Sequence, residues 1–555
     1  MARLILGPML RHVGQTEATV WVETDRPCQV AVLGCTAPTF EILGHHYGLV
    51  VVTGLAPDSR HPYAVELDGQ RAWPLPDSRF PQSCIRTVKS GNPVRILFGS
   101  CRRAAPHSPP HTLHPDRHEL GLGVDALTAM AEMLRSADPG ELPDLLIHGG
   151  DQVYSDLLPP SVQAFVNRRR ETVPGPPREV VDFEEFARLY TEAWSEPTLR
   201  WLLSTVSNLM IFDDHEIHDD WNSSLAWRER VERLPWWHDR MVSGLMTYWV
   251  YQHAGNLDSA GLAKEGLLER LETQAGDAGP LLRRHAELAL EEPASTRWSY
   301  ELALGSVRLV IIDSRSSRVL TRGARDMLDH DEWEWLEEAL SREADHLLVV
   351  CPLPIFLPRG LHDTEGWNEA VCDGAWGAWA MRAAERLRLA LDLEHWAAFQ
   401  RSFRRLARML LDVAAGGGGW TPSTLLCLGG DLHFGYVAEV AAGEGAAPVF
   451  QLTASPMRNR LLPEQQRALK LAASRTAGLV SRCLARLAGL SAPPTTWELS
   501  HGWWIENHLI DLLFEGSRAS LAVRMTVSGS HPEIHTRLLT RLDRSGAGSN
   551  VGTAR

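Results

Sequence analysis

With 555 residues, the chain is longer than one typical hydrophobic core, so we expect at least two domains. Hydrophobic residues make up 44% of the chain and charged residues 22%, which are ordinary values for a globular protein. The formal net charge of -14 argues against broad nucleic-acid binding, which needs a basic surface, but it does not exclude an anionic small molecule.

The N-terminus and the cysteines predict a cellular location. The first residues contain only a brief apolar stretch, without the hydrophobic core, cleavage site or twin-arginine pair of an export signal. No segment predicts a transmembrane helix. The eight cysteines are scattered and form no Cys-x-x-Cys pair, which is typical of free thiols in a reducing compartment. We therefore expect a cytoplasmic protein without disulfides.

Residues 1–91 are expected to form an all-β domain. The segments 18–23 and 29–33 are rich in β-branched or aromatic residues, and turns with Gly, Pro and Asp separate them. Asn92-Pro93 then predicts a joint to the next domain.

From Val94 onward, apolar runs alternate with segments of helical periodicity, such as 125–136 and 331–343. This alternation predicts a layered α/β domain over residues 92–535, followed by a flexible tail over 536–555. Three stretches rich in Leu and Arg interrupt the domain and are expected to be helical insertions, which either cover an active site or only decorate the fold. They span residues 223–296, 360–420 and 461–490.

Five apolar runs end in clusters of acids, His, Cys or Tyr. Short continuous apolar runs predict strands buried on both faces, and ligands gather at the carboxyl ends of such strands. We therefore expect an active site at one sheet edge, and the mixture of carboxylate, imidazole, thiol and phenol favours a metal. The runs are Val94–Gly99, Leu145–His148, Leu209–Phe212, Leu309–Ile312 and Leu425–Leu428.

Gly149-Gly150-Asp151 follows the second run. The two oxygens of Asp151 could bridge two cations, and the glycines allow a close approach of the backbone. An isolated Gly-Asp pair would more often form a turn. Tyr154 is normally a core aromatic, and its phenolate is a useful ligand only beside a ferric ion or a similar Lewis acid.

Asp213-Asp214-His215-Glu216 follows the third run. Asp214 suits a hard cation and His215 suits a proton donor, although a single His after a strand is more often structural. Four titratable residues at a buried strand end are costly unless a cation or partners compensate them. After the fifth run, Asp431 and His433 share one face of a segment that we expect to be extended, so that both could reach adjacent ions.

Cys101 ends the first run. A lone Cys is most often a buried structural thiol. A thiolate at this sheet edge would bind iron or zinc rather than calcium or magnesium.

In chain order, these segments resemble the alkaline phosphatase D family of the calcineurin-like metallophosphatases, over about the first 460 residues. The resemblance implies a four-layer α-β-β-α sandwich behind an N-terminal immunoglobulin- or fibronectin-like β domain. It implies bound iron and calcium, with zinc, manganese or magnesium as alternatives. The matching stretches are Gly99-Ser100-Cys101, Gly150–Tyr154, Asp213–Glu216, Asp313-Ser314-Arg315 and Gly430–His433.

The resemblance also implies a role for each matching residue. His215 matches the proton donor of the family, and Asp151 would connect two metal positions. Asp219-Asp220-Trp221 departs from the family, which has two Asn before Trp, and the extra acids favour a harder or an additional cation. The implied metal ligands are Cys101, Asp151, Tyr154 and His433 on the iron side, and Asp214 and Asp431 at the second position.

The implied activity is metal-dependent hydrolysis of small phosphodiesters and phosphomonoesters. Arg102 or Arg315 could hold a phosphate oxygen by paired hydrogen bonds, or either could form a structural ion pair. One alternative is a cyclic-nucleotide or nucleic-acid phosphodiesterase, although the acidic balance disfavours extended nucleic acid. Another is a binding module without catalysis, which the complete set of acids, His and Cys disfavours. No feature of the sequence specifies the physiological substrate or the oligomeric state.

Overall fold

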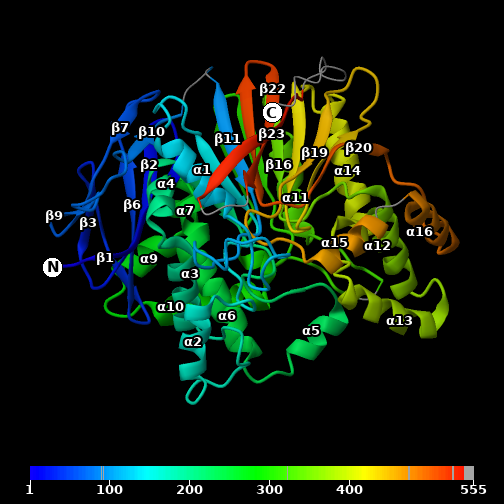
Figure 1. Ribbon diagram of the computed structural model, residues 1–555, viewed down its shortest axis with the longest axis horizontal. Helices are drawn as coiled ribbons and strands as arrows, with labels where there is room; N and C mark the ends of the chain where they lie inside the picture. The colour runs from blue at the N-terminus through cyan, green and yellow to red at the C-terminus, as the bar shows by residue number, and fades with distance from the viewer. Residues whose placement is uncertain (89–90, 92, 322, 473–474, 528–530, 543–555) are drawn as a thin grey trace.

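The protein consists of an N-terminal β region, two large central sheets and the helices that surround them (Figure 1). The computed structural model describes residues 1–88, 91, 93–321, 323–472, 475–527 and 531–542. Along the longest axis, the N-terminal region lies at one end of the protein (Figure 1). The other end consists of α12 (Arg359–Cys372), α13 (Gly377–Ala390) and α16 (Arg475–Leu487). Among the described residues, no helix is both long and apolar enough to cross a lipid bilayer.

Short strands rich in β-branched residues form the N-terminal β region, as predicted. Two four-stranded sheets share a core that includes Val20, Val50 and Val65. The first sheet has the order β1 (Leu4–Val13), β2 (Glu17–Thr24), β6 (His45–Thr53) and β5 (Phe40–Ile42). The second sheet has the order β4 (Cys35–Pro38), β3 (Gln29–Val32), β8 (Val65–Leu67) and β9 (Gln70–Trp73). A separate pair joins β10 (Cys84–Arg86) to β7 (Arg60–Pro62).

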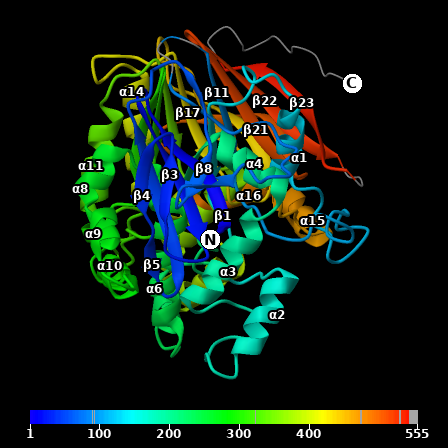
Figure 2. The same ribbon diagram turned by 90° about the vertical axis from the view of Figure 1, so that its left-hand side faces the viewer.

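The first N-terminal sheet is buried on both faces. Trp21, Tyr47 and Leu49 belong to the largest core of the protein rather than to the core between the two N-terminal sheets. β1 also packs against α3 (Phe183–Trp194) and α4 (Pro197–Thr205), which lie beside the N-terminal strands in Figure 2. The N-terminal β region therefore shares a core with the rest of the protein, and the domain boundary expected near residue 91 stays a prediction.

The two central sheets are built around parallel strands. The six-stranded sheet has the order β13 (Ser207–Ile211), β12 (Leu145–Gly149), β11 (Val94–Gly99), β21 (His508–Glu515), β22 (Arg518–Val527) and β23 (Glu533–Arg541). The seven-stranded sheet has the order β14 (Tyr300–Leu304), β15 (Val307–Ile311), β16 (His346–Val350), β17 (Thr424–Gly429), β19 (Val449–Thr453), β18 (Gly435–Val440) and β20 (Trp497–Trp504). β11, β12 and β13 run parallel, as do β15, β16, β17 and β19.

Burial on both faces explains why these parallel strands are continuous apolar runs. One face of the seven-stranded sheet, with Leu309, Leu348 and Leu426, shares a core with the six-stranded sheet. Its other face, with Val349 and Cys427, packs against α11 (His330–Leu340) and α14 (Gln400–Ala414). On the six-stranded sheet, α1 (Ala126–Arg135) packs against β22 and β23.

The two segments predicted to be helical, 125–136 and 331–343, contain α1 and most of α11, and an Asp side chain caps the start of each helix. Asp125 accepts hydrogen bonds from the backbone amides of Leu127 and Thr128 at the start of α1. Asp329 accepts one from Glu332 at the start of α11.

The three stretches predicted to be helical insertions are helical. Residues 223–296 contain α5 (Leu225–Val231), α6 (Trp237–Tyr248), the π-helix η1 (Trp249–His253), α7 (Ala254–Asn256), α8 (Ser259–Glu265), α9 (Leu267–Thr273), α10 (Gly279–Glu291) and η2 (Pro293–Ser295). Residues 360–420 contain most of α12 (Arg359–Cys372), α13 (Gly377–Ala390), η3 (Trp396–Ala398) and α14. Residues 461–490 contain α15 (Pro463–Ala472) and α16 (Arg475–Leu487).

Two predictions about the fold are wrong. The expected flexible tail over 536–555 begins too early, because residues 536–541 belong to β23, which pairs with β22 along its length. Residues 543–555 of this tail lie outside the described residues. The five apolar runs also do not lead to one sheet edge, because three belong to the six-stranded sheet and two to the seven-stranded sheet.

Candidate metal centre

The strand ends of the two central sheets meet through the backbone and one serine. After β11, the Ser100 amide donates to the Ala454 carbonyl oxygen at 3.1 Å, and the Asp431 amide after β17 donates to Ser100 Oγ at 3.3 Å. Within the six-stranded sheet, the Arg102 amide donates to the Asp151 carbonyl oxygen at 3.0 Å. The candidate site therefore lies between two sheets.

Sharp turns place the polar side chains at this junction. Cys101, Asp431 and His433 have φ values of 55°, 62° and 56°, in the left-handed region. Gly430 lies so close to its neighbour that a Cβ atom would approach Ser100 Oγ to 1.9 Å. The prediction that residues 431–433 are extended is therefore wrong. The chain must reverse its direction between β17 and the start of β18.

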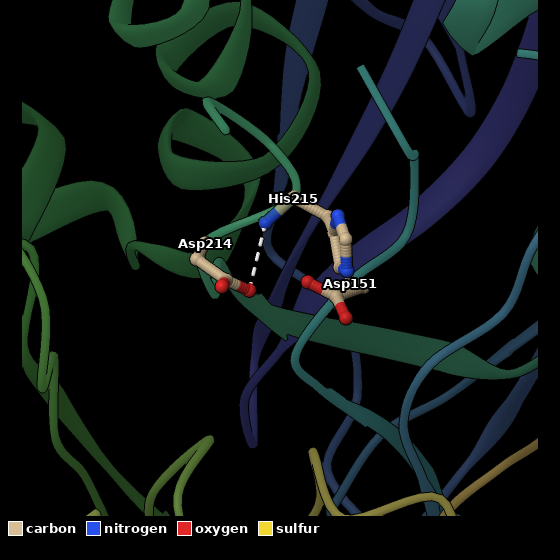
Figure 3. A group of neighbouring side chains, drawn as sticks. All are labelled: Asp151, Asp214 and His215. Atoms are coloured by element: carbon tan, nitrogen blue, oxygen red, sulfur yellow. Dashed lines mark hydrogen bonds between the residues drawn. The ribbon is translucent and has the colours of Figure 1, made fainter. Parts of the chain in front are cut away.

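Two groups of side chains have the spacing of metal ligands. The ligand atoms of Asp151, Asp214 and His215 lie within 4.8 Å of one another (Figure 3), as do those of Asp213, Asp214 and Asp431. Asp214 belongs to both groups. Figure 3 shows the His215 ring beside the Asp151 carboxylate, while the His215 amide donates to Asp214 Oδ1 at 2.9 Å.

Several buried oxygens at this site lack a hydrogen-bond partner among the described residues. Both carboxylate oxygens of Asp151 are unpaired, as are the Tyr154 hydroxyl and Asp213 Oδ2, and these three side chains are at most 1% exposed. Buried polar atoms are rarely left unpaired in a stable protein. A hard cation would satisfy such carboxylates, so the donor set fits bound metal.

The pKa values at the site indicate an excess of negative charge. Burial and neighbouring carboxylates raise the pKa of Asp151, Asp213 and Asp214 above their usual range, although Arg315 and His215 oppose the shift. Burial, together with the charges of Asp151 and Asp431, likewise raises the pKa of the Cys101 thiol. A bound cation reverses such shifts, because it stabilises the anionic forms.

Tyr154 and His433 lie at the same junction. Burial raises the pKa of Tyr154, and the charges of Asp151 and Cys101 add to this shift. Burial lowers the pKa of His433 to about 4 against the opposing charge of Asp431, so its imidazole is neutral at physiological pH, as metal ligation requires. Asn459 Nδ2 lies 3.3 Å from His433 Nε2 and orients the ring.

Acids lie on several sides of His215. Its Nδ1 lies 2.7 Å from Asp156 Oδ1, and its Nε2 lies 3.8 Å from Asp219 Oδ1. Although burial acts to lower it, the charges of Asp156, Asp214 and Asp151 raise the pKa of His215 well above its usual value. A protonated, oriented imidazole beside the metal ligands can donate a proton.

Both predicted arginines form ion pairs, although Arg315 Nη2 has no hydrogen-bond partner among the described residues. Arg102 is 1% exposed, and its guanidinium donates to Asp125 at 2.9 Å and to the Ala193 carbonyl oxygen at 2.8 Å. Arg315 is fully buried and pairs with Asp213 and Glu394. Of the two readings left open by the sequence, the structure shows the ion pair for both residues. Arg315 still adds positive charge beside the acids.

Sequence reasoning missed several groups around the site. Asp156 orients His215, while His395 contacts Asp431 with its Nε2 at 2.8 Å and Glu365 with its Nδ1 at 2.6 Å. Glu394 binds Arg315. The sequence did contain a signal for Glu394 and His395, namely the run of titratable residues in Asp392-Leu393-Glu394-His395. This run was missed because it lies before η3 inside a helical insertion and follows no strand.

Comparisons with known proteins fit this picture. Residues 123–259 match the family of PhoD-like phosphatases, and residues 1–85 match a domain of unknown function, DUF7800. No curated protein sequence matches the chain. The protein is also similar to a solved structure of PhoD, with a TM-score of 0.62 and 11% identity, over 100% of this chain and 93% of that one.

A purple acid phosphatase, PPD1 from yellow lupin (Lupinus luteus) seeds, gives a TM-score of 0.45 and 10% identity, over 95% of this chain and 73% of that one. The match over residues 123–259 contains the stretches with Asp151, Tyr154, Asp214 and His215. The likeness to PhoD extends the shared fold over the whole chain. Together, the family match and the shared fold confirm the resemblance to the alkaline phosphatase D family.

Proposed function

We propose that the protein is a metal-dependent hydrolase of small phosphoesters, both diesters and monoesters. One observation carries this proposal: Asp151, with both oxygens buried and unpaired, lies among further acids at the meeting point of two sheets. Catalytic sites often retain such unsatisfied groups, whereas a structural site would pair them. The likeness to PhoD-like phosphatases over residues 123–259 supports the reaction class.

Cations at this site would polarise the phosphoryl oxygens and lower the pKa of a water molecule. The protein itself supplies the ligands and a proton. His215 donates its Nε2 proton to the leaving oxygen, while Asp156 holds Nδ1 and keeps the ring in one orientation. Asp213 keeps Arg315 next to the acids, which limits their mutual repulsion.

We further propose iron and calcium as the cations, with zinc, manganese or magnesium as alternatives. Cys101 and Tyr154 are soft or strongly basic ligands that favour iron, whereas Asp214 and Asp431 favour a hard cation such as calcium. Cys101→Ala should lower the iron content of the purified protein, and Cys427→Ala should not, although both thiols are fully buried. Equal iron content in the two variants would exclude Cys101 as a ligand.

Two further parts of the proposal concern architecture and location. The shared core of the central sheets, with α1 on one sheet and α11 and α14 on the other, supports a four-layer α-β-β-α sandwich.

The eight unpaired cysteines support the expected cytoplasmic location. Fractionation of the native host cell would test the location.

Hydrolysis of bis-p-nitrophenyl phosphate and p-nitrophenyl phosphate tests the proposed reaction. We expect turnover by the purified protein, loss of turnover after chelation, and recovery when iron and calcium are added together. Metal-loaded protein that hydrolyses neither substrate would contradict the proposal. Binding of either ester without hydrolysis would favour the non-catalytic alternative.

A further inference from the structure

A cavity lies beside the candidate metal centre. Its volume is about 680 Å³, within the range of small-ligand sites. One wall is Asp156, the residue that holds His215 Nδ1 at 2.7 Å. The cavity therefore adjoins the residue that orients the proposed proton donor.

Two unpaired arginines line this cavity. The side chains of Arg103 and Arg178 have no hydrogen-bond or ion-pair partner in the part of the chain that the structure describes. Nearby arginines behave differently, since Arg170 pairs with Glu185 and Arg240 pairs with Glu179. Asp156 is the acid that lines the same cavity, but it forms no ion pair with either arginine because it contacts His215. Two guanidinium groups without an ion-pair partner at one cavity favour an anionic ligand.

Arg103 is the half-buried member of the pair, and groups beside the candidate metal centre act on its charge. Burial lowers its pKa, and the groups that oppose this shift are Tyr154 and Asp156. The Tyr154 ring lies 4.3 Å from the His215 ring, between centroids. A guanidinium at this place can contact a ligand that also reaches His215.

The rest of the cavity wall is held in place and partly apolar. Gln163 on α2 (Pro160–Arg169) donates to Asn167 at 2.9 Å and to the Pro177 carbonyl oxygen at 2.6 Å, which ties the helix to the loop that carries Arg178. Leu158 provides apolar surface. The cavity thus combines two cations, the Asp156 carboxylate, amides and a short apolar wall.

We propose that this cavity is a leaving-group subsite, and that the preferred substrates are phosphoesters whose leaving alcohol carries a second anionic group, a carboxylate or a phosphate. Arg103 and Arg178 bind this group and determine specificity. The inference rests on the proposed hydrolase function and adds the substrate class.

Three phosphomonoesters of similar size test the subsite: glycerol 3-phosphate, 3-phosphoglycerate and glycerol 1,3-bisphosphate. Beyond the scissile phosphate, the first is neutral, the second carries a carboxylate and the third carries a phosphate. We expect kcat/KM to be about tenfold or more higher for at least one anionic substrate than for the neutral one, the gain typical of a charge-assisted hydrogen bond. Preference for the bisphosphate alone would identify a second phosphate as the ligand, and preference for both would indicate any suitably placed anion.

The variants Arg103→Met, Arg178→Met and the double variant should remove this preference while hydrolysis of glycerol 3-phosphate changes less than about threefold, because only the second anion loses its contacts. Arg230→Met, which removes an exposed arginine from α5, is the matched control and should keep the preference. Arg178 is also exposed, so its variant should fold even if Arg103→Met does not. Metal content is measured for each variant.

Two outcomes would overturn the subsite. One is a wild-type protein that hydrolyses bis-p-nitrophenyl phosphate but neither anionic glycerol derivative faster than glycerol 3-phosphate. The other is a double variant that keeps the wild-type preference. Either result leaves the hydrolase function intact. Failure of the metal-loaded protein to hydrolyse any of these esters would overturn the proposed function as well.

Discussion

Two buried clusters of titratable side chains in this protein differ in how they are paired. Beneath the first N-terminal sheet, Glu23 accepts from the Tyr251 hydroxyl at 3.1 Å and contacts His45 at 2.9 Å, while the other His45 nitrogen contacts Glu184 at 2.9 Å. At the metal centre, by contrast, both oxygens of Asp151 are unpaired, as is Asp213 Oδ2.

The two acids Glu23 and Asp151 are almost equally buried, since Glu23 is 2% exposed and Asp151 is 0% exposed. Burial therefore does not distinguish a structural acid from a functional one. Pairing does, because an acid whose partners come from the protein stabilises the fold, whereas an acid without partners needs something from outside the chain. Substitutions in the two clusters should have opposite consequences.

The largest expected effect is that of Asp151→Asn. If Asp151 holds metal as proposed, its loss should remove several kcal/mol of transition-state stabilisation, so hydrolysis should fall by about 10⁴-fold. The melting temperature of the chelated protein should stay equal or rise, because the substitution removes a buried, repelled charge. Glu23→Gln is the counterpart in the paired cluster and should lower the free energy of unfolding by about 1–3 kcal/mol with nearly unchanged turnover. A chelated Asp151→Asn protein that melts lower than wild type would contradict this difference.

His215→Asn should affect substrates according to their leaving groups. An alkyl alkoxide needs a proton, so its ester should lose about 10²–10⁴-fold in rate, whereas p-nitrophenolate leaves without one and should show a modest loss. The metals should stay bound, because the carboxylates remain. The ratio of the two rate losses at matched metal content measures the role, and a ratio near one would exclude proton donation.

His395→Gln tests whether a paired residue next to the candidate metal ligands supports metal binding. His395 contacts the candidate ligand Asp431 at 2.8 Å and is oriented by Glu365. Loss of such a supporting contact typically costs about 10–100-fold in metal affinity. Glu365→Gln should also lower the metal affinity, but by less than His395→Gln. Metal titration of the chelated protein measures both losses. Unchanged metal affinity in both variants would make His395 a structural residue only.

The smallest effect is a pH-dependent loss of stability in His45→Gln. Although burial opposes the shift, hydrogen bonds to Glu184 and Glu23 raise the pKa of His45 to about 9. A raised pKa stabilises the fold fully below the unfolded value of about 6.5, and this contribution disappears as the pH rises through 9. Allowing for partial solvent screening, the variant should lose about 1–2 kcal/mol at pH 6 and almost nothing at pH 9.5, as measured by urea unfolding. An equal loss at both pH values would exclude the ion pairs as the cause.

Local patterns in the sequence predicted most of the fold. Strands such as Val94–Gly99 are apolar runs because they are buried on both faces, and Asp125 marks the start of α1 because it caps the helix. The division of the five runs between two sheets could not be predicted in this way. It depends on contacts between distant segments, such as Ser100 with Ala454, and no local periodicity encodes them.

The candidate site shows the same limit. Seven candidate residues could be identified from the sequence because each follows a strand. They are Cys101, Asp151, Tyr154, Asp214, His215, Asp431 and His433. His395 and Arg103 could not, since one lies in a helical insertion and the other gains its meaning from the cavity that it lines. The pairing of Arg102 with Asp125 also required the folded chain, because it joins the end of β11 to the cap of α1.

Elemental analysis of three proteins, purified and loaded with metal in parallel, would show which of the two clusters binds metal. Wild type, Asp151→Asn and Glu23→Gln are dialysed against iron and calcium, freed of excess ions and analysed for bound metal. We expect Glu23→Gln to bind as much metal as wild type and Asp151→Asn to bind markedly less iron and calcium, because both Asp151 oxygens lack partners among the described residues whereas Glu23 is paired. Equal metal content in wild type and Asp151→Asn would show that the unpaired acids at the strand ends do not hold the cations.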